Sequence, residues 1–168
     1  MTILKHSGGN ISGIIPVQFA FQEDVLSLLV NAQTLTGTLV FKTGKSCNYL
    51  YATDETIQLE GKEEPTVSGM KYVYTLKMLV PKDRSEVELS LFQLNNRNLI
   101  LSVTDKNGIT RLLGNLVNPM KKISKLQKPA PVEGYNGWEV VFTGEFSQPA
   151  PYSVVVAPPN STADPDES

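Results

Sequence analysis

The stretch EGYNGWEVVFTGEFSQPAPY, residues 133–152, decides the fold class of this chain. Gly134 and Gly137 flank a turn, and Pro149 and Pro151 end the segment because proline cannot donate to the hydrogen-bond ladder of a sheet. Between these limits bulky residues alternate, which predicts one strand with two bulky faces: Trp138, Val140 and Phe142 on one, Glu139, Val141 and Thr143 on the other. We therefore expect a β protein in which this strand has a core on one side and a second contact on the other.

Similar alternating runs occur along the rest of the chain, bounded by Gly, Asn, Asp or Pro, which is typical of antiparallel strands with one buried face. One long run is MKYVYTLKMLV, residues 70–80, whose even-numbered positions form an apolar face. Further strands are expected at residues 11–21, 37–42, 48–51, 56–59, 99–104, 110–114 and 138–146. Asn107 and Gly108 supply residues that tolerate positive φ, so a hairpin turn is predicted between two of these strands.

Residues 81–98 interrupt the strand pattern. Asp83 can cap a helix and Glu86 can reach back to it, and three apolar residues follow at helical spacing: Val87, Leu91 and Leu94. One helix of about three turns is predicted. A strand is the alternative, because apolar residues in 87–91 also alternate.

A helix over this segment would place Leu89 and Phe92 on the flank opposite its other apolar residues. Two interpretations follow from this placement. Either the helix is wedged between a sheet and a loop, or the outer pair contacts a neighbouring subunit.

Two polar segments stand apart from the predicted strands. TDETIQLEGKEEPTVS, residues 53–68, contains Glu63 and Glu64 and is predicted to be a protruding hairpin or a long loop. Residues 157–168 are rich in Pro, Ser and acidic residues, so we expect a disordered acidic tail. Residues 1–156 then form a single β-rich domain with an N-terminal arm.

The composition sets further limits. The chain has 168 residues, is 40% hydrophobic and carries 15 Lys and Arg against 17 Asp and Glu, a net charge of -2. This length and apolar content suffice for one packed core, and the charge balance predicts neither a broad nucleic-acid surface nor a basic membrane-binding surface. No secretion signal is recognised at the N-terminus, and no apolar run approaches the roughly 20 residues that cross a bilayer.

Residues that support catalysis are scarce. His6 is the only histidine and Cys47 the only cysteine, so neither a catalytic triad nor a tetrahedral metal site can be assembled. Residues 43–46, TGKS, lack the upstream glycine of a phosphate-binding loop and are interpreted as a hairpin turn. We therefore expect no enzyme activity, no cofactor and no metal.

Lysines gather after Pro119 in a local basic patch: Lys121, Lys122, Lys125 and Lys128. Few aromatic residues lie among them, which argues against a stacking platform for single-stranded nucleic acid. Two interpretations remain: contact with phosphate groups, or pairing with the acidic segment of a neighbouring subunit that includes Glu63 and Glu64.

The segment RLLGNLVNPMKKIS, residues 111–124, followed by GYNGWEVVFTGEFSQPAPY, residues 134–152, resembles a group of small bacteriophage and prophage tail proteins. In that group a hairpin with L-L-G and N-P precedes a terminal strand of the form N-G-[YW]-E-x-x-F-[ST]-G, with P-x-[YF] after it. The leader GGNISGIIPVQF, residues 8–19, and the segment PKDRSEVE, residues 81–88, extend the resemblance to about two thirds of the chain.

The resemblance implies a tail-tube-like subunit: a mainly β protein, an antiparallel β-barrel or sandwich with one flanking α-helix. Such subunits close into rings whose strands continue from one copy to the next, and the long loop would reach the next ring. The implied partners are copies of the same chain and other tail or neck proteins, with DNA only passing through, no sequence-specific DNA binding and no membrane. The implied location is the tail of a virion, after synthesis in the host cytoplasm.

Two functional hypotheses follow. The first is a self-assembling subunit of a tail tube or an adjoining tail or neck ring, with subunit contacts expected at Leu89, Phe92, Lys121, Lys122, Trp138, Val141, Glu63 and Glu64. The second is a β-sandwich binding module that recognises glycan or peptide through exposed aromatic residues: Trp138, Tyr135, Tyr49 and Tyr51.

Overall fold

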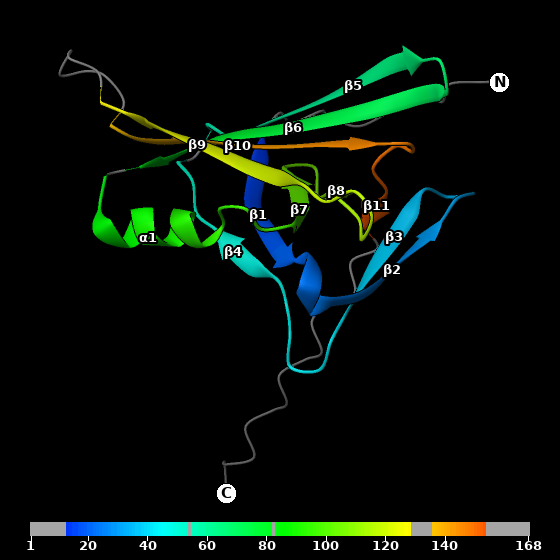
Figure 1. The fold of residues 1–168 in the computed structure, drawn as a ribbon, viewed down its shortest axis with the longest axis horizontal. Coiled ribbons are helices and arrows are strands. Elements are labelled where there is room, and N and C mark those ends of the chain that lie inside the picture. Colours follow the sequence, from blue (N-terminus) through cyan, green and yellow to red (C-terminus); the bar gives the residue numbers. More distant parts are fainter. Residues whose placement is uncertain (1–12, 54, 82, 129–135, 154–168) are drawn as a thin grey trace, which may run out of the picture.

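A computed structural model describes residues 13–153, apart from 54, 82 and 129–135, and its strands form two β-sheets accompanied by one α-helix (Figure 1). The elements are β1 (Ile14–Phe21), a 3-10 turn η1 (Gln22–Asp24), β2 (Val25–Asn31), β3 (Thr36–Phe41), β4 (Asn48–Leu50), β5 (Gln58–Thr66), β6 (Gly69–Pro81), α1 (Ser85–Gln93), β7 (Leu99–Asp105), β8 (Thr110–Leu113), β9 (Lys121–Gln127), β10 (Gly137–Phe146) and β11 (Tyr152–Ser153). The predicted mainly β class is confirmed. Of the two architectures expected, the sandwich fits and no closed barrel is found in the described part of the chain.

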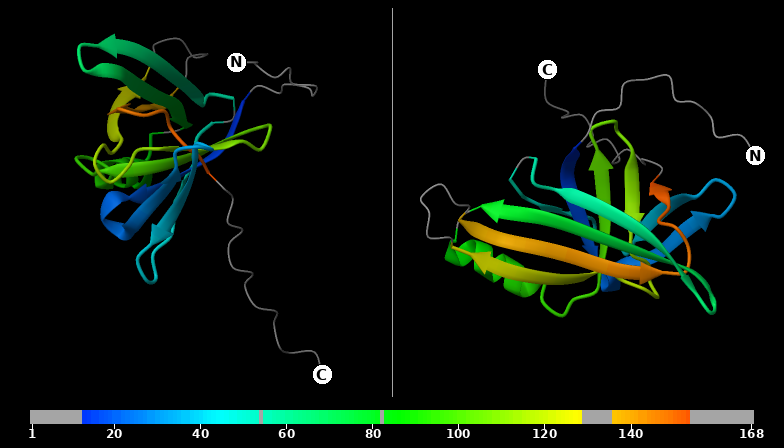
Figure 2. Two further views of the ribbon diagram at one scale, coloured as in Figure 1. Left: turned by 90° about the vertical axis from the view of Figure 1, so that its right-hand side faces the viewer. Right: turned by 90° about the horizontal axis from the view of Figure 1, so that it is seen from above.

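The two sheets differ in size and connection. The larger has seven strands in the order β2-β3-β11-β8-β7-β1-β4, in which β11 is parallel to β3 and antiparallel to β8. The smaller has four strands in the order β5-β6-β10-β9, and every neighbouring pair is antiparallel. Figure 2 shows the long strands of the smaller sheet lying across the larger one, with α1 on the β9 side.

The core lies between the sheets. From the smaller sheet, Leu76 and Met78 of β6 and Val140 and Phe142 of β10 are completely buried. They pack against one cluster supplied by the larger sheet and its neighbours: Val17, Leu99, Leu101, Val103, Leu113 and Met120. Burial of side chains of this size contributes about 1.5–3 kcal/mol each, so this layer is the main source of stability.

The predicted faces of the two long strands are confirmed. Tyr74 and Val80 of β6 point inward with the buried residues named above, and on β10 so does Gly144. A Cβ atom at Gly144 would lie 2.6 Å from Met120 Sδ and 2.7 Å from Phe146 Cζ. A glycine is therefore required here for close packing of the strand against its neighbours.

The predicted hairpin between β7 and β8 is also confirmed. Gly108 has φ +79°, and its N–H donates to the carbonyl of Asp105 at 3.0 Å. The Asp105 side chain accepts N–H groups from Asn107 at 2.8 Å and Ile109 at 2.9 Å, so the carboxylate holds the turn. Of the two residues expected to tolerate positive φ, Gly108 is the one that adopts it.

The helix is present, but its predicted cap is wrong. α1 begins at Ser85, and the N-cap position is Arg84, whose side chain makes no capping hydrogen bond. Asp83 lies one residue too early and forms an ion pair with Lys128 instead. Leu91 and Leu94 are buried beneath the sheet, which is what makes this segment helical rather than a strand.

The prediction of a long loop at residues 53–68 is wrong, and its alternative, a protruding hairpin, is found. β5 pairs with β6 along its whole length, from Gln58 opposite Lys77 to Thr66 opposite Gly69. Every residue of β5 except Leu59 is exposed. Both faces of this edge strand are exposed to solvent, so apolar and polar residues need not alternate along it. Its polar composition therefore left a long loop as one interpretation of the sequence.

Other strands were missed, and one connection was misread. β2, β9 and β11 were not predicted as strands. Gly44 does form a turn, with φ +75°, but this turn joins β3 to β4, which are not neighbours in the sheet. The hairpin predicted at residues 43–46 is therefore wrong. The predicted N-terminal arm, the turn at Gly134 and the tail at 157–168 lie wholly or mostly outside the described residues.

Candidate subunit interface

The four-stranded sheet has two edges that no described strand covers. β5 forms one edge and β9 forms the other. Because each neighbouring pair is antiparallel, the two edge strands run in opposite directions. β9 of one copy can consequently lie antiparallel beside β5 of a second copy and extend the same sheet.

The residues on the outward face form rows that cross the sheet from edge to edge. One row runs from Glu60 on β5 through Thr75 and Thr143 to Lys121 on β9. Its two ends are exposed and carry opposite charges, and Glu60 also lies 3.3 Å from Lys62 Nζ of its own strand. If the rows continue without stagger into a second copy, Lys121 of one copy meets Glu60 of the next.

Lys122 faces the other way. It belongs to the inward row that runs from Leu59 through Leu76 and Phe142, and it ends beneath the sheet against α1. Its Nζ donates to the Leu91 carbonyl at 2.7 Å and to Ser124 Oγ at 3.1 Å. Burial lowers the pKa of Lys122 because the charged form loses water. Lys122 thus fixes the end of α1 to β9 and is not a free interface charge.

The rest of the predicted basic patch is divided in the same way. Lys121 donates from Nζ to Asn98 Oδ1, and Lys128 pairs with Asp83. Lys125 is exposed on the outward face, opposite Glu139 of β10. The outward face of β9 therefore carries Lys121 and Lys125.

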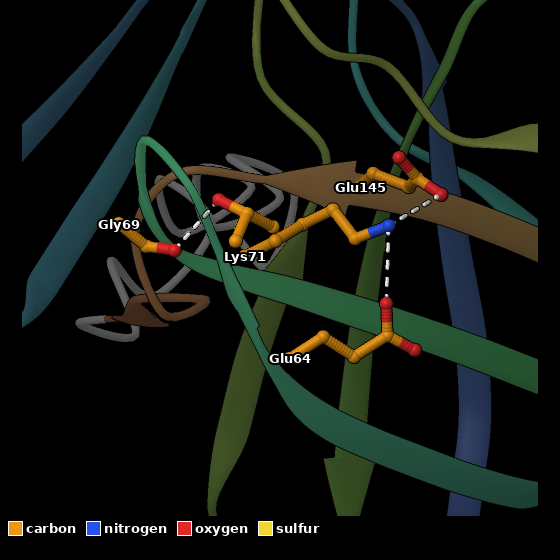
Figure 3. A network of polar contacts seen from close by, with 5 residues as sticks. Glu64, Gly69, Lys71 and Glu145 are labelled. Carbon is orange, nitrogen blue, oxygen red and sulfur yellow. Dashed lines mark hydrogen bonds and ion pairs between the residues drawn. The ribbon is translucent and has the colours of Figure 1, made fainter.

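The β5 edge has an ion-pair network near the tip of the β5–β6 hairpin (Figure 3). Lys71 Nζ lies 3.1 Å from Glu64 and 3.4 Å from Glu145, which ties three strands together. Hydrogen bonding to Glu64, and then to Glu145, raises the pKa of Lys71. Glu64 is thus already paired within its own chain.

Glu63 lies on the opposite face of β5 from Glu64. Its cross-strand partner is Tyr72, and it lines a hollow between the sheets. The two glutamates predicted to act together therefore point to different sides of the hairpin.

The outer surface of α1 is apolar. Leu89 is 59% exposed and Phe92 is 68% exposed, whereas Leu91 between them is buried. The contact of Leu91 with Lys122 places this surface next to the β9 edge. The sequence interpretation of an outward-facing apolar pair fits this arrangement.

The two predicted contacts on β10 occupy different environments. Trp138 is half-buried, packs against the core and has Val80 and Leu126 as cross-strand neighbours. Val141 faces outward beside Ile123, which is 64% exposed. Val141 and Ile123 therefore belong to the outer face, and Trp138 belongs to the edge of the core.

Two exposed tyrosines lie at the far end of the larger sheet. Tyr49 is 72% exposed and Tyr51 is 76% exposed, and both line a depression of about 500 Å³ with Pro81 and Val87. Tyr135, the third aromatic residue expected to stack on a ligand, lies outside the described residues. Tyr49 and Tyr51 form the only part of the predicted aromatic set that is brought together as an open surface in the described chain.

Within the residues that the structure describes, no group of three or more His, Cys, Asp or Glu side chains is arranged to hold a metal ion. None of the described helices is long and apolar enough to span a membrane. Comparisons with family models, with curated proteins and with solved structures find no match to this chain.

Sequence reasoning missed the most informative part of this site, which is the pairing of edges. The missing signal was β9, whose inward residues Lys122, Ser124 and Leu126 show no apolar alternation. Once residues 121–127 are known to be a strand, the opposite charges at the two edges can be read from the sequence.

Proposed function

We propose that this protein is a structural subunit of a bacteriophage tail tube or of an adjoining tail or neck ring, and that it assembles through the edges of its four-stranded sheet. The observation that carries the self-assembly is the pair of uncovered edges, β5 and β9, which run in opposite directions and end an outward row on Glu60 and Lys121. The phage tail assignment rests on the sequence resemblance of residues 111–152.

Two physical arguments support assembly by these edges. An uncovered edge strand presents unpaired N–H and C=O groups, which promote pairing with another chain unless the edge is protected. The contact between β9 and β5 joins two different surfaces, so each copy retains one free edge of each kind. Such head-to-tail contacts close into rings when the rotation between copies permits.

The proposed partners and location follow from this role. The main partner is a second copy of the chain, and other tail or neck proteins would meet the finished ring. DNA would pass the assembly as cargo, without sequence-specific binding. The protein would be made in the host cytoplasm and end in the tail of the virion.

A charge-swap experiment tests the proposed edge contact. Lys121→Glu and Glu60→Lys should each weaken assembly, because each places like charges at the joint, and the double variant should restore it. Light scattering coupled to gel filtration, with negative-stain microscopy of the same fractions, measures the outcome. Lys42→Glu, an exposed lysine at the end of β3, is the matched control.

The results decide the proposal directly. Rings or tubes from the wild type, lost in the single variants and regained in the double variant, are the expected result. A wild-type chain that stays monomeric at all concentrations, alone and with preformed tail structures as seeds, would overturn the proposal.

A second candidate function is supported by the depression lined by Tyr49 and Tyr51. Exposed tyrosines beside a cavity of about 500 Å³ are suited to stacking on a sugar ring or on a peptide side chain. A monomer that binds members of a glycan or peptide array, and loses this binding in Tyr51→Ala, would replace the assembly proposal with this one.

A further inference from the structure

The space between the two sheets is covered by the helix on one side of the sandwich and is hollow on the other. On the β9 side, α1 covers the space between the sheets. On the β5 side lie two adjoining hollows, of about 370 Å³ and 300 Å³, which share Leu59 and Arg111 in their walls. We call them together the β5 groove, and its apolar wall consists of Ile14, Ile57, Leu59, Val103 and Ile109.

Two polar residues in the wall of the β5 groove, Arg111 and Asp105, already have partners within the chain. Arg111 donates to the Ala150 carbonyl at 3.3 Å, and its guanidinium lies 4.2 Å from the centre of the Tyr152 ring. The carboxylate of Asp105 accepts the N–H groups of its own turn. An occupant of the larger hollow therefore meets apolar side chains beside two polar residues that already have partners, which favours an apolar occupant there. Lys62 and Glu63 line the smaller hollow.

The exposed apolar surface of α1 lies on the opposite side of the molecule from the β5 groove, at a similar position along the strands. The inward row from Leu59 to Lys122 begins in the wall of the β5 groove and ends where Lys122 Nζ contacts the Leu91 carbonyl of α1. Phe92 follows Leu91 directly, and Leu89 lies one helical turn from Phe92. The exposed pair on α1 and the groove are thus at the same height along the strands.

From this arrangement we infer that Leu89 and Phe92 of one copy insert into the β5 groove of the next copy. The inference rests on the proposed pairing of β9 with β5, which brings α1 of one copy under the β5 edge of its neighbour. One face of α1 then covers the space between the sheets of its own copy, and its other face covers the β5 groove of the neighbouring copy. The apolar contact adds to the backbone pairing at the same joint, and it fixes the stagger between copies.

Engineered disulfides test where Phe92 lies in the assembly. In a Cys47→Ser background, which removes the only native thiol, Phe92→Cys is combined with Ile109→Cys, a groove residue that is 50% exposed. Mild oxidation of assembled protein should give a ladder of covalently linked chains on a denaturing gel. The control combines Phe92→Cys with Leu26→Cys, which is 62% exposed on β2 and should give no ladder beyond the dimers formed through Phe92→Cys alone.

A second measurement does not require a cross-link. Leu89→Ser with Phe92→Ser should raise the concentration needed for assembly at least tenfold. The unfolding curve of the isolated variant should stay close to that of the wild type, because both side chains are exposed in the single chain. The matched control is Leu26→Ser with Leu29→Ser, two leucines that are each 62% exposed on β2.

The possible outcomes separate the inference from the function on which it rests. If the wild type assembles and the swap of Lys121 and Glu60 behaves as expected, but Phe92→Cys does not link to Ile109→Cys, the helix contact is wrong and the edge pairing stands. Unchanged assembly of the Leu89→Ser, Phe92→Ser variant leads to the same conclusion. If the wild type does not assemble, both proposals are wrong.

Discussion

The two inner strands of the four-stranded sheet and its two edge strands differ in burial and therefore in sequence pattern. β6 and β10 each bury one complete face, so their sequences alternate and both were predicted almost to the residue. β5 and β9 have no such face: β5 is exposed along nearly all its length, and the inward side of β9 carries Lys122, which contacts α1. Alternation of apolar and polar residues thus indicates that a strand has one buried face. A strand without a buried face lacks this pattern and is not predicted from sequence, even when it belongs to the same sheet.

This difference predicts that mutations in the inner strands and mutations in the edge strands affect different properties of the protein. Changes in the inner strands should alter the free energy of unfolding, because these strands form the core. Changes on the outward faces of the edge strands should alter association and leave the single chain folded. The following expectations run from the largest effect on stability to the smallest.

Phe142→Ala should have the largest effect. Phe142 is completely buried between the sheets, and truncation of such a side chain costs about 3–5 kcal/mol through lost burial and the cavity left behind. Urea denaturation followed by tryptophan fluorescence or circular dichroism measures the change. Ile123→Ala on β9 is the control and should change stability by no more than about 0.5 kcal/mol. Equal losses for the two variants would contradict the division between inner and edge strands.

Gly144→Ala should destabilise the chain by about 1–3 kcal/mol, because the added methyl group overpacks the core. The new Cβ would lie 2.6 Å from Met120 Sδ and 2.7 Å from Phe146 Cζ, so both neighbours must move. The midpoint of thermal unfolding is the simplest measurement. Gly69→Ala is a poor control because Gly69 has φ +123°, so Thr143→Ala, next to Gly144 and facing outward, is used instead. An unchanged midpoint for Gly144→Ala would show that this part of the core is loosely packed.

Tyr74→Phe should cost about 1 kcal/mol, because it removes one buried hydrogen bond and keeps the ring. The Tyr74 hydroxyl accepts the N–H of Ala150 at 3.1 Å, and this contact holds the segment after β10 to the neighbouring strand. Chemical denaturation gives the free energy, and faster hydrogen exchange at Ala150 would locate the loss. Tyr72→Phe, at a half-buried tyrosine of the same strand, leaves the Tyr74 hydrogen bond in place and should change neither quantity appreciably. Exchange at Ala150 that is unaffected by Tyr74→Phe would rule out this account.

Lys122→Met should change the pH dependence of stability in the alkaline range. Burial lowers the pKa of Lys122, so in the alkaline range below the ordinary lysine pKa the unfolded chain binds more protons than the folded chain. Stability from this site therefore rises with pH through that window, and Lys122→Met should lose the rise. The Leu91 carbonyl also accepts the N–H of Leu94 at 3.2 Å, so the substitution does not remove its other partner. Urea titrations across the alkaline range test this, and parallel curves for the two proteins would contradict it.

The extent of the sequence prediction follows from the same physics. The class, the inner strands, the β7–β8 turn and the helix were predictable because each depends on local alternation, turn residues or helical spacing. The cap failed because Asp83 lies one residue too early, a shift within the usual uncertainty of helix ends. The pairing of Lys121 with Glu60 across one row was not predictable, because a row is set by the register of three strand pairs and only the fold reveals it.

The candidate site was predicted in part. Leu89 and Phe92 could be assigned to an outer surface from helical spacing alone. Alternation placed Trp138 on the face of Val140 and Phe142, where it packs against the core, so the strand pattern located it better than its assignment as a subunit contact did. Lys121 and Lys122 are adjacent in the sequence and point to opposite faces of one strand, so treating residues 121–128 as a single patch combined groups that do different work.

The position of β11 has a consequence for biosynthesis. Tyr152 pairs with Thr36 on one side and Arg111 on the other, so among the described strands β11 alone links the β2–β3 pair to the rest of the larger sheet. A nascent chain cannot complete that sheet until Tyr152 has left the ribosome, although β2 and β3 were made near its beginning. Until that moment β3 lacks the strand that joins it to β8, and a premature stop shortly before Tyr152 would release a protein in which the β2–β3 pair is not joined to the rest of the larger sheet.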